Sequence, residues 1–205
     1  NALSTNLEVW IRRDGKEYNM SFIGGKKQGK LEVVGNVGKS NTGTSIRFWP
    51  DEQYFDTSKF SLNQLKHTLK AKAVLCPGLI VSLKVEKPEE KIEWLYQGGL
   101  EQYLVEEIAS SETLPSEPFS ANFEGKNEAV EFALAWIAEP TTNITESYVN
   151  LIPTPQGGTH VNGLRTGLTN AIREFCDFRN LLPRGIVIAP EDVWKNCNFV
   201  LSIKM

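Results

Sequence analysis

The chain has 205 residues, of which 40% are hydrophobic and 23% charged, an ordinary composition for a globular protein. Its formal net charge of −3 excludes a surface that is basic throughout, but it does not exclude a local basic face. The sequence has no signal-peptide pattern and no apolar run of membrane-spanning length, and its three cysteines lack metal-ligand spacing. We therefore expect a cytoplasmic protein with reduced thiols and no membrane partner.

The first third of the chain predicts a β-sheet. Leu7, Val9 and Ile11 alternate with residues that would face the other way, which is the period-two pattern of a half-buried strand. Asp14-Gly15 is a strong hairpin signal, and the alternation resumes after it. Strands are expected over 6–13, 18–22, 31–35 and 44–50.

The period then changes to that of a helix. Ser61 and Gln64 form a capping box, apolar residues follow at helical spacing, and Cys76-Pro77-Gly78 ends the pattern. Two strands and a short amphipathic helix are expected next, over 79–85, 92–96 and 100–108.

A polar stretch, "SSETLPSEP" at 110–118, contains two prolines and shows no periodicity. We expect a linker and a domain boundary there. Beyond it the pattern predicts strands over 129–136, 146–153, 184–189 and 199–205, and helices over 161–175 and 190–194. The whole sequence thus predicts an α+β protein with two domains.

The segment "QGGTHVNGLRTGL", residues 156–168, resembles a phosphate loop at first sight. No lysine follows the glycines, and their spacing is not that of a dinucleotide fingerprint. We favour a tight turn followed by a helix that Thr159 caps through its hydroxyl. His160 is then a hydrogen-bonding or packing residue, and Arg165 is either solvated or a contact for nucleic acid. No carboxylate pair or nucleophile elbow occurs elsewhere, so the residues alone predict no self-sufficient active site.

Three long blocks, "NTGTSIRFWPD", "AKAVLCPGL" and "YVNLIPTPQGGTHVNGLRTGL", resemble the B subunit of bacterial type IIA DNA topoisomerases. "LKAKAVLCPG" and "REFCDFRNLLPRG" are more like the topoisomerase IV paralogue (ParE) than the gyrase one. The resemblance implies that residues 1–113 are the C-terminal part of a GHKL-type ATPase α/β sandwich. Residues 117–205 would then be a truncated transducer domain, whose α/β fold is shared with a small-subunit ribosomal protein.

The resemblance also implies a function. ATP, with Mg²⁺, would make two B subunits close on a DNA duplex, and the transducer would relay this closure to the cleavage core. The implied partners are DNA, the A subunit of topoisomerase IV and a second B subunit, in an A2B2 assembly. The alternatives are a fragment of the B subunit of DNA gyrase, or a free-standing nucleic-acid or protein-binding module with no ATP role.

Four residues match functional positions of the family. Thr44 matches a threonine beside the adenine, and Ile46 an apolar wall of the ATP pocket. Arg13 matches an arginine at the pocket mouth that aminocoumarin inhibitors engage, and Arg165 one that faces the DNA cavity. The catalytic glutamate, the magnesium-binding asparagine and the Gln/Lys loop have no match in this sequence, so the resemblance implies a fragment that is inactive alone.

Overall fold

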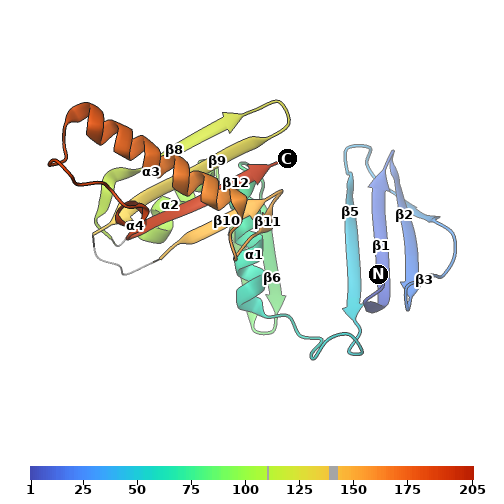
Figure 1. The fold of residues 1–205 in the computed structure, drawn as a ribbon. Helices are drawn as coiled ribbons and strands as arrows, with labels where there is room; N and C mark the ends of the chain where they lie inside the picture. The colour runs from blue at the N-terminus through green and yellow to red at the C-terminus, as the bar shows by residue number, and fades with distance from the viewer. Residues whose placement is uncertain (110, 139–142) are drawn as a thin grey trace. The chain divides into compact units, whose positions relative to one another are not determined.

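The computed structural model describes residues 1–109, 111–138 and 143–205. The chain forms two compact units, Asn1–Leu62 and Asn63–Met205. Both helices and strands are present, so the α+β prediction is confirmed (Figure 1).

The first unit is one antiparallel sheet without helices (Figure 1). The strand order is β3-β2-β1-β5, and β4 also pairs with β2. Asp14 and Gly15 both have positive φ angles, 54° and 77°, as the predicted hairpin turn between β1 and β2 requires. The strands are β1 (Ser4–Arg13), β2 (Lys16–Ile23), β3 (Lys26–Lys27), β4 (Glu32–Asn36) and β5 (Gly43–Pro50).

The register gives this sheet one apolar face, because residues directly opposite one another on paired strands point to the same side. Three cross-strand rows make up what we call the apolar face: Phe22-Leu7-Phe48, Met20-Val9-Ile46 and Tyr18-Ile11-Thr44. No hydrophobic side chain of residues 1–62 is buried. Within this unit the sheet therefore has no core of its own.

The second unit has a five-stranded mixed sheet, in the order β11-β10-β12-β9-β8, and a separate β6-β7 hairpin. Strands β10 and β12 run parallel, whereas the other pairs are antiparallel. The helices are α1 (Leu62–Leu75), α2 (Gly99–Ile108), α3 (Thr159–Arg179) and α4 (Pro190–Trp194). The strands are β6 (Val81–Glu86), β7 (Glu89–Trp94), β8 (Thr113–Glu124), β9 (Ala129–Ile137), β10 (Thr145–Val149), β11 (Ile152–Pro153) and β12 (Cys197–Lys204).

Helices cover both faces of this sheet. Ala133 and Ala135 of β9 pack in one cluster with residues of α1 and α2. Leu134, between them, packs in a second cluster with Val161 and Leu164 of α3. This alternation buries β9 and β12 on both sides, which explains their almost continuous apolar sequence.

Two predicted features are wrong. Residues 113–118 of the expected linker belong to strand β8, and residue 110 lies outside the described residues. Pairing of β8 with β9 shifts register between Leu114 and Phe119, so the prolines at 115 and 118 fall where no ladder N–H is needed. Residues 184–189 form no strand; Arg173 Nε donates to the carbonyl of Ile188 at 2.8 Å and holds this segment against α3.

The contrast between neighbouring residues of α2 gives a stability prediction. Leu104 is fully buried, whereas Val105 is 45% exposed. We expect Leu104→Ala to lower the free energy of unfolding by about 2–5 kcal/mol, through lost burial and a residual cavity. Val105→Ala, the matched control, should change it by less than about 1 kcal/mol. Urea denaturation of both variants measures this, and equal losses would contradict the placement of the core.

Candidate functional site

Thr44 and Ile46 lie on β5, the strand at one end of the order β3-β2-β1-β5. They are two residues apart, pair with Ile11 and Val9, and so share the apolar face. Ile46 is 61% exposed, and Thr44 is also exposed. Thr44 is thus a hydroxyl at the margin of an open apolar surface, a position from which it can donate to or accept from a ligand's polar edge.

Arg13 is the last residue of β1 and continues the face that Val9 and Ile11 define, because it follows them at even spacing. Its side chain is 78% exposed, and its Nε lies 3.7 Å from a carboxylate oxygen of Asp14. Such an exposed pair contributes little to stability and leaves the guanidinium available. The structure therefore brings Arg13, Thr44 and Ile46 to one face of one sheet.

The opposite face of the same sheet carries a different arginine. The guanidinium carbon of Arg47 lies 5.8 Å and 5.9 Å from the ring centroids of Trp10 and Trp49. Its Nη1 also lies 3.9 Å from a carboxylate oxygen of Glu8. Arg47 is held by cation–π and ionic contacts, so the two faces differ in chemistry as well as in polarity.

Arg165 lies on α3 and belongs to the second unit, whereas the other three predicted residues belong to the first. It is exposed, and its guanidinium carbon lies 5.5 Å from the ring centroid of Trp194. It lines a pocket of about 360 Å³ together with residues at the beginning of α3, among them Gly157, Gly158 and Asn162. A cation beside a helix N-terminus makes this pocket electropositive.

The beginning of α3 corrects one prediction and confirms another. Gly158, not Thr159, is the N-cap residue, and no side chain caps the helix. The turn needs glycine there, because φ is 153° and a Cβ would lie 3.0 Å from the ring of His160. Nε2 of His160 lies 3.0 Å from Oγ1 of Thr154, so His160 is the hydrogen-bonding residue we expected.

A partly buried polar network joins α2 to β10, and sequence reasoning missed it. The hydroxyls of Tyr103 and Tyr148 donate to the two carboxylate oxygens of Glu146, at 2.9 Å and 2.6 Å. His67 of α1 lies 4.0 Å from the same carboxylate. Burial, together with the charge of Glu146, raises the pKa of both tyrosines well above the usual range. The one signal in the sequence was the presence of tyrosines at core-facing positions, since a buried tyrosine hydroxyl needs a hydrogen-bond partner.

The cysteines form no disulfide, and the acidic, histidine and cysteine side chains of the described residues form no cluster of metal-ligand type. All three cysteines are free. Burial raises the pKa of the Cys197 thiol to about 12, and the nearby Arg165 opposes this shift. Among the described residues no group of three or more His, Cys, Asp or Glu side chains could hold a metal ion. No described helix is long and apolar enough to cross a membrane.

The DNA gyrase B family model matches residues 99–205, more than half of the chain. The chain therefore belongs to the DNA gyrase B family. It is 59% identical over its full length to the B subunit of DNA topoisomerase 4 from Pseudomonas aeruginosa. The chain spans about a third (33%) of the length of that relative.

Solved structures also match this chain over its whole length. The topoisomerase IV ATP-binding domain of Francisella tularensis, solved with a small-molecule inhibitor, is 42% identical with a TM-score of 0.82, and the chain covers 55% of it. The 43K ATPase domain of Thermus thermophilus gyrase B, solved with an aminocoumarin, is 25% identical with a TM-score of 0.82, and the chain covers 56% of it. The expected likeness to the B subunit of topoisomerase IV is confirmed.

The buried thiol gives a prediction for alkaline pH. A free cysteine titrates near about 8.5. Because Cys197 stays protonated in the folded chain up to about pH 12, its contribution to stability is complete below about pH 8.5 and is lost as pH rises above it. Between about pH 8.5 and 10 the free energy of unfolding should fall by up to about 1.4 kcal/mol per pH unit for this group.

Cys197→Ala should flatten this part of the profile, measured by urea denaturation at several pH values. Cys176→Ala, which alters a half-buried thiol of α3, serves as the control. If the slope is unchanged in Cys197→Ala, the assignment of the alkaline loss to this thiol is wrong.

Proposed function

We propose that this chain works as part of an ATP-dependent type II DNA topoisomerase, in which it links nucleotide binding to movement of DNA. The observation that carries this proposal is the apolar face of the first sheet. It places Thr44 and Ile46 side by side on an exposed apolar surface, with Arg13 at its margin. An apolar plane with one hydroxyl at its edge suits a planar heterocycle such as adenine.

The apolar face needs a cover, because large exposed apolar patches are found at interfaces and ligand sites rather than on free surfaces. The similar ATP-binding domain of Francisella tularensis is nearly twice as long as this chain. We propose that the remainder of such an ATPase domain packs on this face and, with Mg²⁺, completes the ATP site.

The two halves of the chain then have different roles. In this proposal the first belongs to a GHKL-type ATPase domain and the second is a transducer. The predicted division was 1–113 and 117–205. The family match begins at Gly99, the first residue of α2, and α2 packs in the same cluster as β9 and β12. Both observations favour a boundary before α2 over one near residue 113, and the compact units divide earlier still, between Leu62 and Asn63.

Arg165 is the proposed DNA contact. It is exposed, forms no ion pair with any described residue, and lies in the electropositive pocket at the beginning of α3. A guanidinium in such a place suits a phosphate of the DNA backbone. The proposed partners of the whole enzyme are DNA, the A subunit of topoisomerase IV and a second B subunit, in the bacterial cytoplasm.

The chain by itself should not hydrolyse ATP. It has no residue that we match to the catalytic glutamate, the magnesium-binding asparagine or the Gln/Lys loop. We propose that these groups act from other parts of the enzyme and that this chain contributes binding and relay only.

A thermal-shift titration with a non-hydrolysable ATP analogue and Mg²⁺ tests the nucleotide site. A ligand that binds only the native state raises the melting temperature. We expect a shift for the full-length enzyme and a much smaller one for the 205-residue chain alone. Thr44→Val in the enzyme should weaken binding about ten-fold, through loss of one hydrogen bond to the base. An equal shift for the chain alone, or full affinity in Thr44→Val, would contradict the placement of the site.

Two arginines of α3 offer a matched test of the DNA contact. Arg165 and Arg179 both lie over aromatic rings, at 5.5 Å and 5.7 Å. Arg165→Ala should reduce DNA-stimulated ATPase activity of the full-length enzyme several-fold while basal activity is retained, because the phosphate contact is lost. The contact with Trp194 is lost as well, and Arg179→Ala controls for it because it removes a similar contact with Phe175. Arg179→Ala should change neither rate. Equal loss of both rates in Arg165→Ala would indicate a folding role instead.

A further inference from the structure

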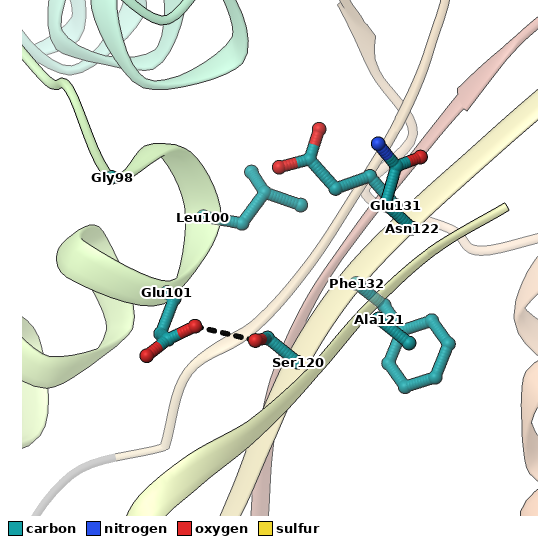
Figure 2. Close-up of a pocket in the computed structure, with 8 residues that line it drawn as sticks. All are labelled: Gly98, Leu100, Glu101, Ser120, Ala121, Asn122, Glu131 and Phe132. Atoms are coloured by element: carbon teal, nitrogen blue, oxygen red, sulfur yellow. Dashed lines mark hydrogen bonds between the residues drawn. The ribbon is translucent and has the colours of Figure 1, made fainter.

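Two adjoining hollows lie on the α2 side of the second sheet and share Asn122 and Glu131. The first, of about 210 Å³, extends from Gly98 at the beginning of α2 to β8 (Figure 2). The second, of about 90 Å³, continues to Ser202 and Lys204 of β12. Nothing in the proposed ATP or DNA sites uses these residues.

The register places three polar side chains in one row. Asn122 of β8 lies opposite Glu131 of β9, and Glu131 lies opposite Ser202 of β12. Directly opposite residues point to the same face with neighbouring Cβ atoms about 5 Å apart. We call these three residues the polar row. The neighbouring positions Ala133 and Val200 are apolar and buried beneath α2, so the polar row ends the apolar core at this edge.

The polar row is not satisfied by the protein. Ser202 is 2% exposed, and its Oγ is the only buried side-chain oxygen or nitrogen among the described residues without a hydrogen-bond partner. Within the described part of the chain the half-buried carboxylate of Glu131 also forms no hydrogen bond or ion pair. A buried polar group without a partner is destabilising, which is why such groups point to a missing ligand or water.

The carboxylate of Glu131 lies beside the backbone at the beginning of α2. Gly99 has φ +55°, and a Cβ on it would lie 3.1 Å from Oε1 of Glu131. The partial positive charge of the helix N-terminus favours a carboxylate there. Glu131 is not needed as a cap for the two preceding residues, because Oε1 of Gln102 already accepts from the N–H groups of Gln97 and Gly98.

The local charge selects the ligand. Glu101 is already engaged, since its carboxylate accepts a hydrogen bond from Ser120 across the first hollow (Figure 2). Lys204 lines the outer end of the second hollow and forms no ion pair with any described residue. Glu124 also lines this hollow, so its carboxylate and the ammonium of Lys204 offset each other there. The polar row itself then carries one negative charge and two neutral oxygen donors, and a monovalent cation balances that charge.

We propose that the polar row of Asn122, Glu131 and Ser202 binds one monovalent alkali metal cation. A carboxylate, an amide oxygen and a hydroxyl are hard oxygen donors of the kind such ions prefer. The cation supplies the missing partner of Ser202 Oγ and neutralises Glu131. It thereby ties β8, β9 and β12 together beside the beginning of α2. This site belongs to the second unit alone and does not depend on the proposed nucleotide site.

Equilibrium dialysis of the 205-residue chain against Rb⁺ tests the proposal, with choline chloride holding the ionic strength constant. We expect saturable binding of one Rb⁺ per chain. Glu131→Gln should weaken it at least about ten-fold, because a charge-assisted ligand is lost. Glu174→Gln, which removes the same charge from an exposed position on α3, should leave it unchanged. Absence of saturable binding, or equal weakening by both variants, would overturn the proposal.

Thermal melting in KCl and in choline chloride provides a second readout. The wild type should have a higher melting temperature in KCl than in choline chloride. Ser202→Ala should have the same melting temperature in both salts, and in choline chloride it should melt at a higher temperature than the wild type. If Ser202→Ala raises the melting temperature equally in both salts, the hydroxyl is merely unsatisfied. If Glu131→Gln lowers it equally in both salts, the carboxylate only stabilises α2. Either result would contradict a cation site.

Discussion

Burial of β9 and β12 on both faces is the constraint on which the second unit depends. Their side chains alternate between a cluster with α1 and α2 and a cluster with α3, so neither strand can shift by one residue without exposing its core. The parallel pairing of β10 with β12 follows from this arrangement, because the chain returns through α3 to reach the centre of the sheet. Arg165, Glu146 and the polar row are all positioned by this double-sided core.

The sheet of the first unit differs, because neither of its faces is buried within the unit. Its sheet has one apolar face and one polar face, and no hydrophobic side chain of residues 1–62 is buried. A sheet of this kind is stable only when another element or a ligand covers the apolar side. The same exposure that lowers the stability of the unit would give Thr44 and Ile46 access to the proposed nucleotide. Stability of this unit and function are therefore linked through one surface.

Much of the fold could be predicted from the sequence. Asp14-Gly15 defined the hairpin because both residues tolerate positive φ, and helical spacing located α1, α2 and α3. Strand β8 could not be recognised, since two prolines hide a strand whose pairing is interrupted between Leu114 and Phe119. Residues 184–189 were wrongly predicted as a strand because they form a short apolar run. In the structure Ile186 and Val187 are 57% and 74% exposed.

The candidate sites were less accessible to such reasoning. A threonine in a strand and an arginine at the end of a hairpin strand are common. Thr44 and Arg13 were therefore predicted as site residues only through the resemblance to the topoisomerase family. Glu146 meets Tyr103 only through packing of α2 on β10, which no local pattern encodes. Glu131 did leave a signal, because it is a charged residue at a core-facing position of an otherwise apolar strand. Such a residue indicates either a buried partner or a ligand.

Amide hydrogen exchange on the 205-residue chain tests the central contrast between the two units most directly. Amides of β9 and β12 should exchange only when the second unit unfolds. Amides of β1, which is paired on both sides but lies in a sheet without a core, should exchange at least about a hundred-fold faster. Equal protection of β1 and β9 would contradict the account, because the first sheet would then be stable without a cover on its apolar face.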